Sequence, residues 1–399
     1  MPETHPDCAS RSENGAQGPS LRRSRAAFLA STFLFWAALY VFVPILPVYA
    51  ETMVDNLTMV GVVIASYALP QLLFRIPIGV YYDAAQRRKP IVVLSVAAAI
   101  VGCVGLALAV GGGTLFLGRA MTGVAAAGWV AFTTFFTGYY PAGRSARAIG
   151  TLSAVQQVSL VAATGSGGFL ADEFGYQAVF LVAAVLAALA LLALAFAREP
   201  AAPPRERTRV ALRDVATGPL LIASSVMAVL LQFAAFSSIF GFIPSYGASI
   251  GASNSDLGVI TMVTLAASAV AAVASVRVAE RFGYTVALCL GAALLGGSLL
   301  LVPATPTPET LALVQVAGGL GRGSLQTLLM ALSIRSAPPG SRATAMGVYQ
   351  AVYAIGMLAG PLVSGAVADS LDLGSVFRLS AVLALTIALI ALHRVVRRA

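Results

Sequence analysis

The segment RRSRAAFLASTFLFWAALYVFVPILPVYA, residues 22–50, decides the fold. Three arginines precede an apolar run that continues to Ala50 without a charged side chain. A helix of about 20 apolar residues crosses the ~30 Å hydrocarbon core of a bilayer. The run is too long for the apolar part of a signal peptide and has no clean small-residue cleavage site, so we interpret it as a membrane span. The polar residues 1–21 are expected to form a disordered cytoplasmic tail.

Similar apolar runs recur along the chain. Of the 399 residues, 58% are hydrophobic and 10% are charged, with a mean hydropathy of +0.87, whereas soluble domains are about 25% charged. The runs are about twice as long as a barrel strand and do not alternate, so they predict an all-α membrane protein. We place twelve spans near residues 27–49, 57–81, 90–110, 113–139, 146–170, 176–197, 219–245, 255–276, 284–303, 310–334, 343–367 and 373–393.

The basic residues indicate the orientation. Lys and Arg lie mainly in the N-terminal tail, in alternate connections and at the C-terminus. Basic segments stay in the cytoplasm, so we expect both termini there, an even number of spans and a multi-pass protein of the cytoplasmic membrane. The remaining connections carry no basic residue, and four of the six carry acidic ones; they are residues 50–56, 111–112, 171–175, 246–254, 304–309 and 368–372.

The two halves of the chain resemble each other at an offset of 197 residues. Pro, Gly and acidic residues coincide at helix ends: Pro47 with Pro244, Gly61 with Gly258, Gly168 with Gly365, and Asp172 with Asp369. We therefore expect two six-helix halves, 22–197 and 219–399, joined by a flexible cytoplasmic linker at 198–218. Parallel repeats are a transporter architecture, in which a site between the halves opens to either side in turn. The alternative is a large membrane scaffold built by duplication.

The loop after the second predicted span carries a partial signature made of Gly79, Asp83, Arg87 and Arg88. With it, and with Arg119 four positions before a glycine in the fourth span, the chain resembles the major facilitator superfamily over residues 22–398. The pattern is closest to bacterial drug and metabolite efflux carriers. In the fifth span Ala163 and Thr164 replace the Gly-Pro pair of the family's antiporters, which weakens an assignment as an antiporter.

The same loop has a physical interpretation. A glycine lets two helices approach closely, and a carboxylate at a helix end can accept hydrogen bonds from arginines or from helix N-termini. We interpret Gly79, Asp83, Arg87 and Arg88 as a latch that holds one conformation and breaks in the other. The alternative is a solvated helix end whose arginines only fix the topology.

Among the arginines inside predicted spans, where a charge costs about 2.5–3.5 kcal/mol on insertion scales, we single out Arg75, Arg119 and Arg322. Arg75 is near the inner end of the second span, on the face that carries Asp83, and we expect it to be structural and to reach the inner interface or a carboxylate there. Arg119 and Arg322 have no acidic residue at comparable depth in any span. Their partners are expected to be backbone carbonyls, polar side chains or a bound anion.

Other polar groups lie at mid-depth. An unpaired amide that faces lipid would cost several kcal/mol, and a small-molecule cavity combines apolar walls with a few convergent polar groups. Arg322 and Gln326, four residues apart, share one helix face. The candidate residues for solute binding and translocation are Arg119, Gln156, Gln232, Arg322, Gln326, Gln350 and Tyr40.

Several function classes find no support in the sequence. The net charge is +9, but the arginines lie in short gaps between apolar runs, which argues against nucleic acid as a partner. The two histidines lie near the termini and the three cysteines are scattered, so we expect no metal site and no disulfide framework. The sequence has no glycine-rich phosphate loop with a lysine, so ATP is not expected to drive transport directly. We expect neither a cofactor nor enzymatic activity.

We therefore expect a monomeric secondary transporter that moves a small solute by alternating access and exports an amphipathic drug or metabolite. Uptake of a small organic anion through Arg119 and Arg322 is one alternative, and a non-transporting sensor or scaffold is another. A central cleft lined by Gln232, Arg322 and Gln350 would argue against the latter. Protons are a candidate coupling ion, but the spans contain no His and no carboxylate near their middle. Transport would then be coupled through a carboxylate at a span edge, through a proton or charge that the solute carries, or would proceed by facilitated diffusion without coupling.

Overall fold

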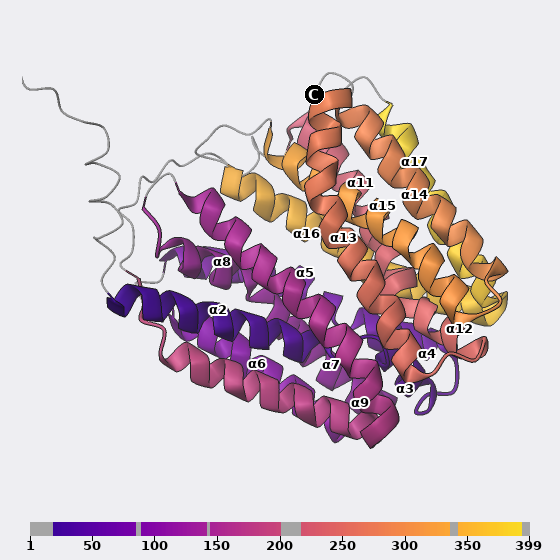
Figure 1. Cartoon of the computed structure of the whole chain (residues 1–399), viewed down its shortest axis with the longest axis horizontal. Coiled ribbons are helices and arrows are strands. Elements are labelled where there is room, and N and C mark those ends of the chain that lie inside the picture. Colours follow the sequence, from indigo (N-terminus) through magenta and orange to yellow (C-terminus); the bar gives the residue numbers. More distant parts are fainter. Residues whose placement is uncertain (1–18, 85–88, 142–143, 201–216, 336–341, 393–399) are drawn as a thin grey trace, which may run out of the picture.

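The computed structural model describes residues 19–84, 89–141, 144–200, 217–335 and 342–392, and its regular elements are helices (Figure 1). Helices of the first half of the chain gather on one side of the molecule, where Figure 1 draws them in indigo to magenta. They are α2 (Pro19–Tyr40), α3 (Leu46–Glu51), α4 (Leu57–Ala65), α5 (Ala68–Ala84), α6 (Lys89–Ala107), α7 (Gly112–Ala127), α8 (Trp129–Thr137) and α9 (Ser145–Ala195).

Helices of the second half gather on the other side, in orange to yellow. They are α11 (Pro219–Ser237), the π-helical turn η1 (Ser238–Phe242), α12 (Ile243–Ser249), α13 (Asn254–Phe282), α14 (Tyr284–Leu301), the 3₁₀ turn η2 (Val302–Ala304), α15 (Pro308–Arg335), α16 (Arg342–Ser370) and α17 (Leu373–Ala391). The all-helical prediction is confirmed. The exact boundaries of the two halves remain a prediction, because residues 201–216 of the linker lie outside the described residues.

The helices coincide with the predicted spans but are less regular than the apolar runs. The helix of the first span is broken between Tyr40 and Leu46, next to Pro44. The backbone nitrogen of a proline carries no hydrogen and cannot donate a helical hydrogen bond. The fifth and sixth spans form one long element, α9, which bends at Gly175. The backbone of Gly175 has φ 79° and ψ 166°, a conformation that glycine adopts without a steric cost.

The outer surface of the bundle is apolar. Large hydrophobic side chains such as Leu94, Leu117, Leu313 and Leu389 are more than half exposed. Water-soluble proteins rarely expose apolar surface on this scale, so this surface faces lipid. In the described part, nine helical stretches are long and apolar enough to cross a membrane, and one of them, Arg147–Ala195, covers two predicted spans. The count of twelve spans and the cytoplasmic location of the termini remain predictions.

The two ends of the molecule differ in how closely the halves pack. We call the end with Glu51, Asp172 and Asp369 the acidic end, and the opposite end, where Arg144 and Arg335 lie, the basic end. In Figure 1 the two sets of helices meet around α3, α4 and α12 at the acidic end and spread apart toward the basic end.

Glycines show the same difference at atomic scale. At the acidic end, a Cβ added to Gly61 of α4 would lie 3.3 Å from the Cα of Gly365 in α16, and one added to Gly258 of α13 would lie 3.2 Å from the Cα of Gly168 in α9. These close approaches join the two halves, and the repeat relates them to each other. At the basic end, Gly150 and Gly347 are also related by the repeat, and a Cβ added to either meets no described atom within 4 Å.

Candidate functional site

Arg119 occupies the most buried position of the three arginines singled out in the spans. It lies on α7 and is only 3% exposed. Its guanidinium carbon stands 4.3 Å from the ring centre of Tyr67 and 5.5 Å from that of Phe42. Its Nε and Nη1 atoms are buried and have no hydrogen-bond partner among the described residues. The aromatic faces attract the cation, but two of its nitrogens lack a hydrogen-bond acceptor among the described residues.

Arg322 extends from α15 of the second half. Its guanidinium carbon lies 5.1 Å from the ring centre of Phe240, and its Nε is buried without a partner in the part of the chain that the structure describes. Phe240 belongs to η1, which interrupts the predicted span 219–245. Turns of π-helix inside α-helices are rare and often occur at functional sites. This turn places an aromatic ring against the guanidinium.

Arg75 connects the two halves through neutral groups. From α5 its Nη1 donates to the Tyr353 hydroxyl of α16 at 2.9 Å and to the Gln350 backbone carbonyl at 3.4 Å. Its Nη2 donates to Gln71 Oε1 at 2.6 Å. Its hydrogen-bond acceptors among the described residues are uncharged and lie on α5 and α16, so the structural role of Arg75 at the inner interface remains a prediction. Gln350 takes part through its backbone, whereas the sequence suggested its side chain.

Tyr40 lies at the centre of these residues. Its ring packs edge-on against Phe240, with centroids 6.1 Å apart, and Phe240 in turn faces the Arg322 guanidinium. Both halves thus contribute to one group of side chains, which we call the central cluster. Its members are Tyr40, Tyr67, Arg75 and Arg119 from the first half, and Phe240, Arg322 and Tyr353 from the second.

The predicted glutamines are placed less directly. Gln232 of α11 is buried, and its Oε1 lacks a partner among the described residues. It lies one turn before Phe236, whose ring stacks on Tyr67 at 6.3 Å. Gln326 follows Arg322 by one turn and is half-buried. Gln156 is half-buried on α9. A cleft lined by Gln232, Arg322 and Gln350 remains a prediction.

The predicted latch lies at the edge of the described residues. Gly79 and Asp83 belong to the last turns of α5, but the surroundings of Gly79 and of the Asp83 side chain are not described. Arg87 and Arg88 lie outside the described residues. The latch therefore remains a prediction.

A different set of contacts, absent from the sequence interpretation, joins the halves at the acidic end. The Asp369 carboxylate of α16 accepts hydrogen bonds from the backbone N–H groups of Leu57 and Thr58 at 2.9 and 2.7 Å, and from the Thr58 hydroxyl. Asn56 accepts from the N–H of Met59 at 2.9 Å. The first turn of α4 is therefore capped from both halves, which satisfies N–H groups that lack a partner inside the helix.

The repeat-related helix start has the same arrangement. The Asp172 carboxylate of α9 accepts from the backbone N–H groups of Asn254 and Ser255 at 3.2 and 2.7 Å, and from their side chains at 2.9 and 2.6 Å. Ser253 caps the N–H of Asp256 within α13. The sequence alignment had paired Asp172 with Asp369 but could not reveal which helix each one caps.

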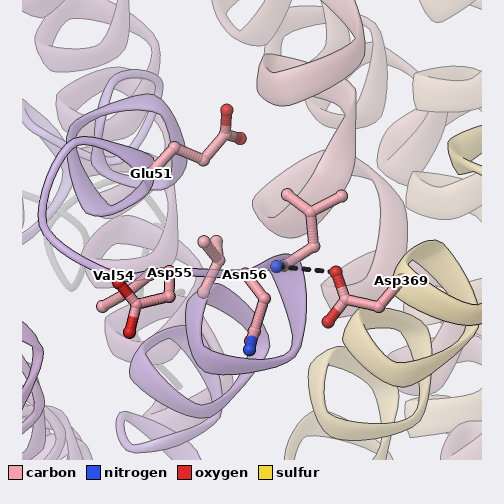
Figure 2. Close-up of a pocket in the computed structure, with 7 residues that line it drawn as sticks. Glu51, Val54, Asp55, Asn56 and Asp369 are labelled. Atoms are coloured by element: carbon pink, nitrogen blue, oxygen red, sulfur yellow. Dashed lines mark hydrogen bonds between the residues drawn. The ribbon is translucent and has the colours of Figure 1, made fainter.

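A cavity of about 300 Å³ opens beside the Asp369 cap (Figure 2). Figure 2 shows Asp369 pointing toward the start of α4, with Asp55 and Asn56 along the rim. The other lining residues are Glu51, Val54, Leu57 and Val60. The cavity thus lies at the acidic end, away from the central cluster.

Comparison with known proteins identifies relatives. The profile of the Major Facilitator Superfamily matches residues 28–251 and 225–399. The multidrug resistance protein MdtG of Salmonella heidelberg is 28% identical over 251 residues, which cover 60% of this chain and 62% of that protein. MdtG of Citrobacter koseri is also 28% identical, over 60% of this chain and 61% of its own. The match thus spans less than two thirds of these relatives.

Solved structures share the fold at lower identity. A bacterial homologue of the human lysosomal transporter Spinster, in an inward-facing and unoccupied conformation, superposes with a TM-score of 0.72, 18% identity and 96% coverage of both chains. A mutant of the nucleoside transporter NupG gives a TM-score of 0.79 at 13% identity, over 92% of this chain and 98% of its own. At these identities the likeness concerns the fold.

Proposed function

Because the chain belongs to the major facilitator superfamily, we propose that this transporter exports an amphipathic drug or metabolite across the cytoplasmic membrane by alternating access. The curated relatives are named multidrug resistance proteins, which supports export. The central cluster supplies both parts of a site for such a solute, aromatic walls and a few polar groups. It takes residues from both halves, as a site that opens to either side in turn requires.

The observation that carries the proposal is the pair of caps formed by Asp172 and Asp369. Each carboxylate fixes the start of a helix in the opposite half, and a close glycine contact stands beside each cap. Helix starts attract negative charge, so the caps hold the acidic end closed. With that end outside the cell, the arrangement corresponds to an inward-facing state, and solute release requires both caps to separate.

A reversible cross-link at the acidic end tests this mechanism. Asp172 and Ser255 lie within hydrogen-bond distance across the halves, so Asp172→Cys with Ser255→Cys, in a chain whose own cysteines are replaced, places two thiols together. We expect oxidation to stop the accumulation of a fluorescent drug inside inside-out vesicles, which reports export, and a reducing agent to restore it. The matched control carries Ser255→Cys alone.

The same vesicles distinguish the other functions. Transport in the opposite direction would replace export by uptake. A compound that binds the purified protein but is never transported would favour a sensor. Transport that continues at full rate with the cross-link formed would contradict alternating access through this end.

A further inference from the structure

The central cluster contains three guanidinium groups and no carboxylate. Arginine keeps its positive charge in proteins. The spans that carry Tyr40, Arg75, Arg119 and Arg322 have no Asp or Glu. Among the described residues, the acidic side chains lie near the two ends of the bundle. Among the described residues, no acidic side chain therefore balances the positive charge of the central cluster.

The contacts inside the cluster compensate the three charges unequally. Arg75 has acceptors for both of its terminal nitrogens, and only its Nε is buried without a partner among the described residues. Arg119 faces Tyr67 and Phe42, and Arg322 faces Phe240, but buried nitrogens of both remain without a partner in the described part of the chain. An aromatic face attracts a cation without accepting its N–H hydrogen bonds in the plane of the guanidinium. Buried donors without acceptors are rare in proteins and call for a partner.

From this arrangement we infer that the transported solute is an organic anion, with one carboxylate, phosphonate or sulfonate group attached to an aromatic or aliphatic body. The inference rests on the proposed transport function and names its solute class. Arg119 of the first half and Arg322 of the second bind the acidic group, because guanidinium groups pair with such oxygens through parallel N–H···O bonds. Arg75, already hydrogen-bonded, serves as a positioning residue.

The aromatic residues of the cluster fit the body of such a solute. Tyr40, Tyr67, Phe240 and Tyr353 surround the guanidinium groups, and apolar walls with few polar groups are typical of small-molecule sites. Tyr40 contacts Phe240 beside Arg322, and its hydroxyl can donate a hydrogen bond to the acidic group. An ammonium in this position would meet three like charges.

The chain contains its own optical probe of the site. Its only two tryptophans, Trp36 and Trp129, pack edge-on with centroids 5.2 Å apart, and Trp36 also contacts Tyr40 at 5.8 Å. Ligand binding beside Tyr40 is thus expected to change the intrinsic fluorescence. This readout does not require transport, so it tests the solute class independently of the proposed function.

The test uses the purified full chain in phosphatidylcholine nanodiscs and three probes of one shape: 4-phenylbutyrate, 4-phenylbutanol and 4-phenylbutylammonium. We expect the carboxylate to bind at least about tenfold more tightly than the alcohol, and the ammonium to bind most weakly, because a charge-assisted hydrogen bond is worth about tenfold or more. Equal binding of all three by the unmodified chain, or preference for the ammonium, would overturn the inference. No substitution is needed for this comparison.

Variants then locate the site. Arg322→Gln and Arg119→Gln are each expected to lower carboxylate affinity about tenfold and to leave alcohol affinity unchanged. Arg277→Gln, at an exposed arginine of α13, is the control and should bind like the unmodified chain. If Arg119→Gln fails to fold, the half-buried Arg322 gives the decisive variant. Full carboxylate binding in folded Arg322→Gln would contradict the assignment.

Two further measurements distinguish a solute site from a lipid-headgroup site, and anion binding from transport. Phosphatidylglycerol in the nanodiscs should not compete with phenylbutyrate; competition that depends on Arg322 would assign the site to a lipid headgroup instead of a solute. Transport is then measured in vesicles. Selective anion binding without transport would support the anion site and contradict the proposed transport function. Transport of cations with no anion binding would support transport and contradict the anion site.

Discussion

Asp172 and Asp369 lie 197 residues apart in the sequence, and each accepts hydrogen bonds from the first two backbone N–H groups of a helix in the opposite half. Asp369 binds the start of α4 and Asp172 the start of α13. Within each helix, Asn56 or Ser253 caps the third N–H. Each first turn is thus capped jointly by its own half and by the other, and both joint caps must break when the halves part at the acidic end.

The first prediction concerns the charge of these caps. Asp172→Asn with Asp369→Asn keeps an acceptor oxygen but removes the attraction between carboxylate and helix start, which is worth about 0.3–1 kcal/mol for each exposed group. We expect the equilibrium to shift toward opening of the acidic end by about 0.6–2 kcal/mol, a factor of about 3–30. The measurement is the rate at which a maleimide labels Val60→Cys, because Val60 is fully buried beside Asp369.

Asp372 provides the matched control. Its carboxylate accepts from the N–H of Ser375 at 2.5 Å and caps α17 within its own half. Asp372→Asn removes the same kind of charge without affecting a contact between halves, so the labelling rate should stay unchanged. If Asp372→Asn speeds the labelling of Val60→Cys as much as the Asp172→Asn and Asp369→Asn pair does, the caps stabilise helices but do not hold the halves together.

The second prediction concerns the glycine contact beside the cap. A Cβ at Gly61 would collide with the backbone carbonyl of Pro361, which cannot move without its helix. Overpacking of this kind typically costs about 1–3 kcal/mol. We expect Gly61→Ala to separate α4 from α16, to speed the labelling of Val60→Cys and to lower the melting temperature.

Gly347 tests whether the effect is specific. It lies on α16, and an added Cβ there meets nothing within 4 Å among the described atoms. Gly347→Ala should leave labelling unchanged and can raise helix stability slightly, because Ala is about 1 kcal/mol better than Gly inside a helix. A Gly61→Ala variant that labels and melts like the unmodified chain would contradict the close contact.

The third prediction removes one atom from the central cluster. Tyr40→Phe keeps the ring contacts with Phe240 and Trp36 but deletes the hydroxyl. If this group donates to the bound acid, phenylbutyrate affinity should fall about 2–10-fold, the usual worth of one hydrogen bond. Tyr246→Phe, which loses a 3.1 Å bond to the Thr305 carbonyl near the acidic end, should not change the affinity.

These predictions use features that differ in how visible they are in the sequence. Arg119 and Arg322 could be identified because a charge inside an apolar run is rare and expensive. The partners of these arginines could not, because Tyr67 and Phe240 look like any aromatic residue in a lipid-facing helix. Phe240 reaches Arg322 through a π-helical turn, and a run of apolar residues contains no signal for that turn.

The interface between the halves was also only partly predictable from the sequence. The repeat correctly paired Asp172 with Asp369 and Gly61 with Gly258, since identical residues coincide at one offset. Which helix each carboxylate caps depends on the packing of segments far apart in the chain, and a repeat does not encode that packing. The spans followed from hydropathy, but the break after Tyr40 lies within one apolar run, where hydropathy gives no signal and only Pro44 marks it.

The fourth prediction tests the latch. Asp83→Asn should slow transport strongly while phenylbutyrate binding remains, because a latch at the end of α5 serves the exchange between conformations and is distant in sequence from the binding arginines. Glu280→Gln, at the position that the repeat relates to Asp83, is the comparison. Unchanged flux in Asp83→Asn would exclude the latch.

The last prediction concerns the driving force. The predicted spans contain neither a histidine nor a carboxylate near their middle, so the usual proton relay of such carriers is absent from the middle of the spans. A solute that carries one negative charge through the central cluster needs no relay, because a membrane potential acts on the charge with about 2.3 kcal/mol per 100 mV. We expect the phenylbutyrate concentration on the outer side of the membrane, relative to that on the cytoplasmic side, to rise with the membrane potential. The ratio should increase about tenfold for each ~60 mV by which the cytoplasmic side is made more negative. The measurement uses vesicles with a potassium diffusion potential set by valinomycin, first with a pH gradient and then after nigericin has collapsed it. If flux follows the pH gradient and ignores the potential, coupling through an edge carboxylate is favoured, and neutralising Asp172, Asp369 and Asp83 one at a time then shows which one carries the proton.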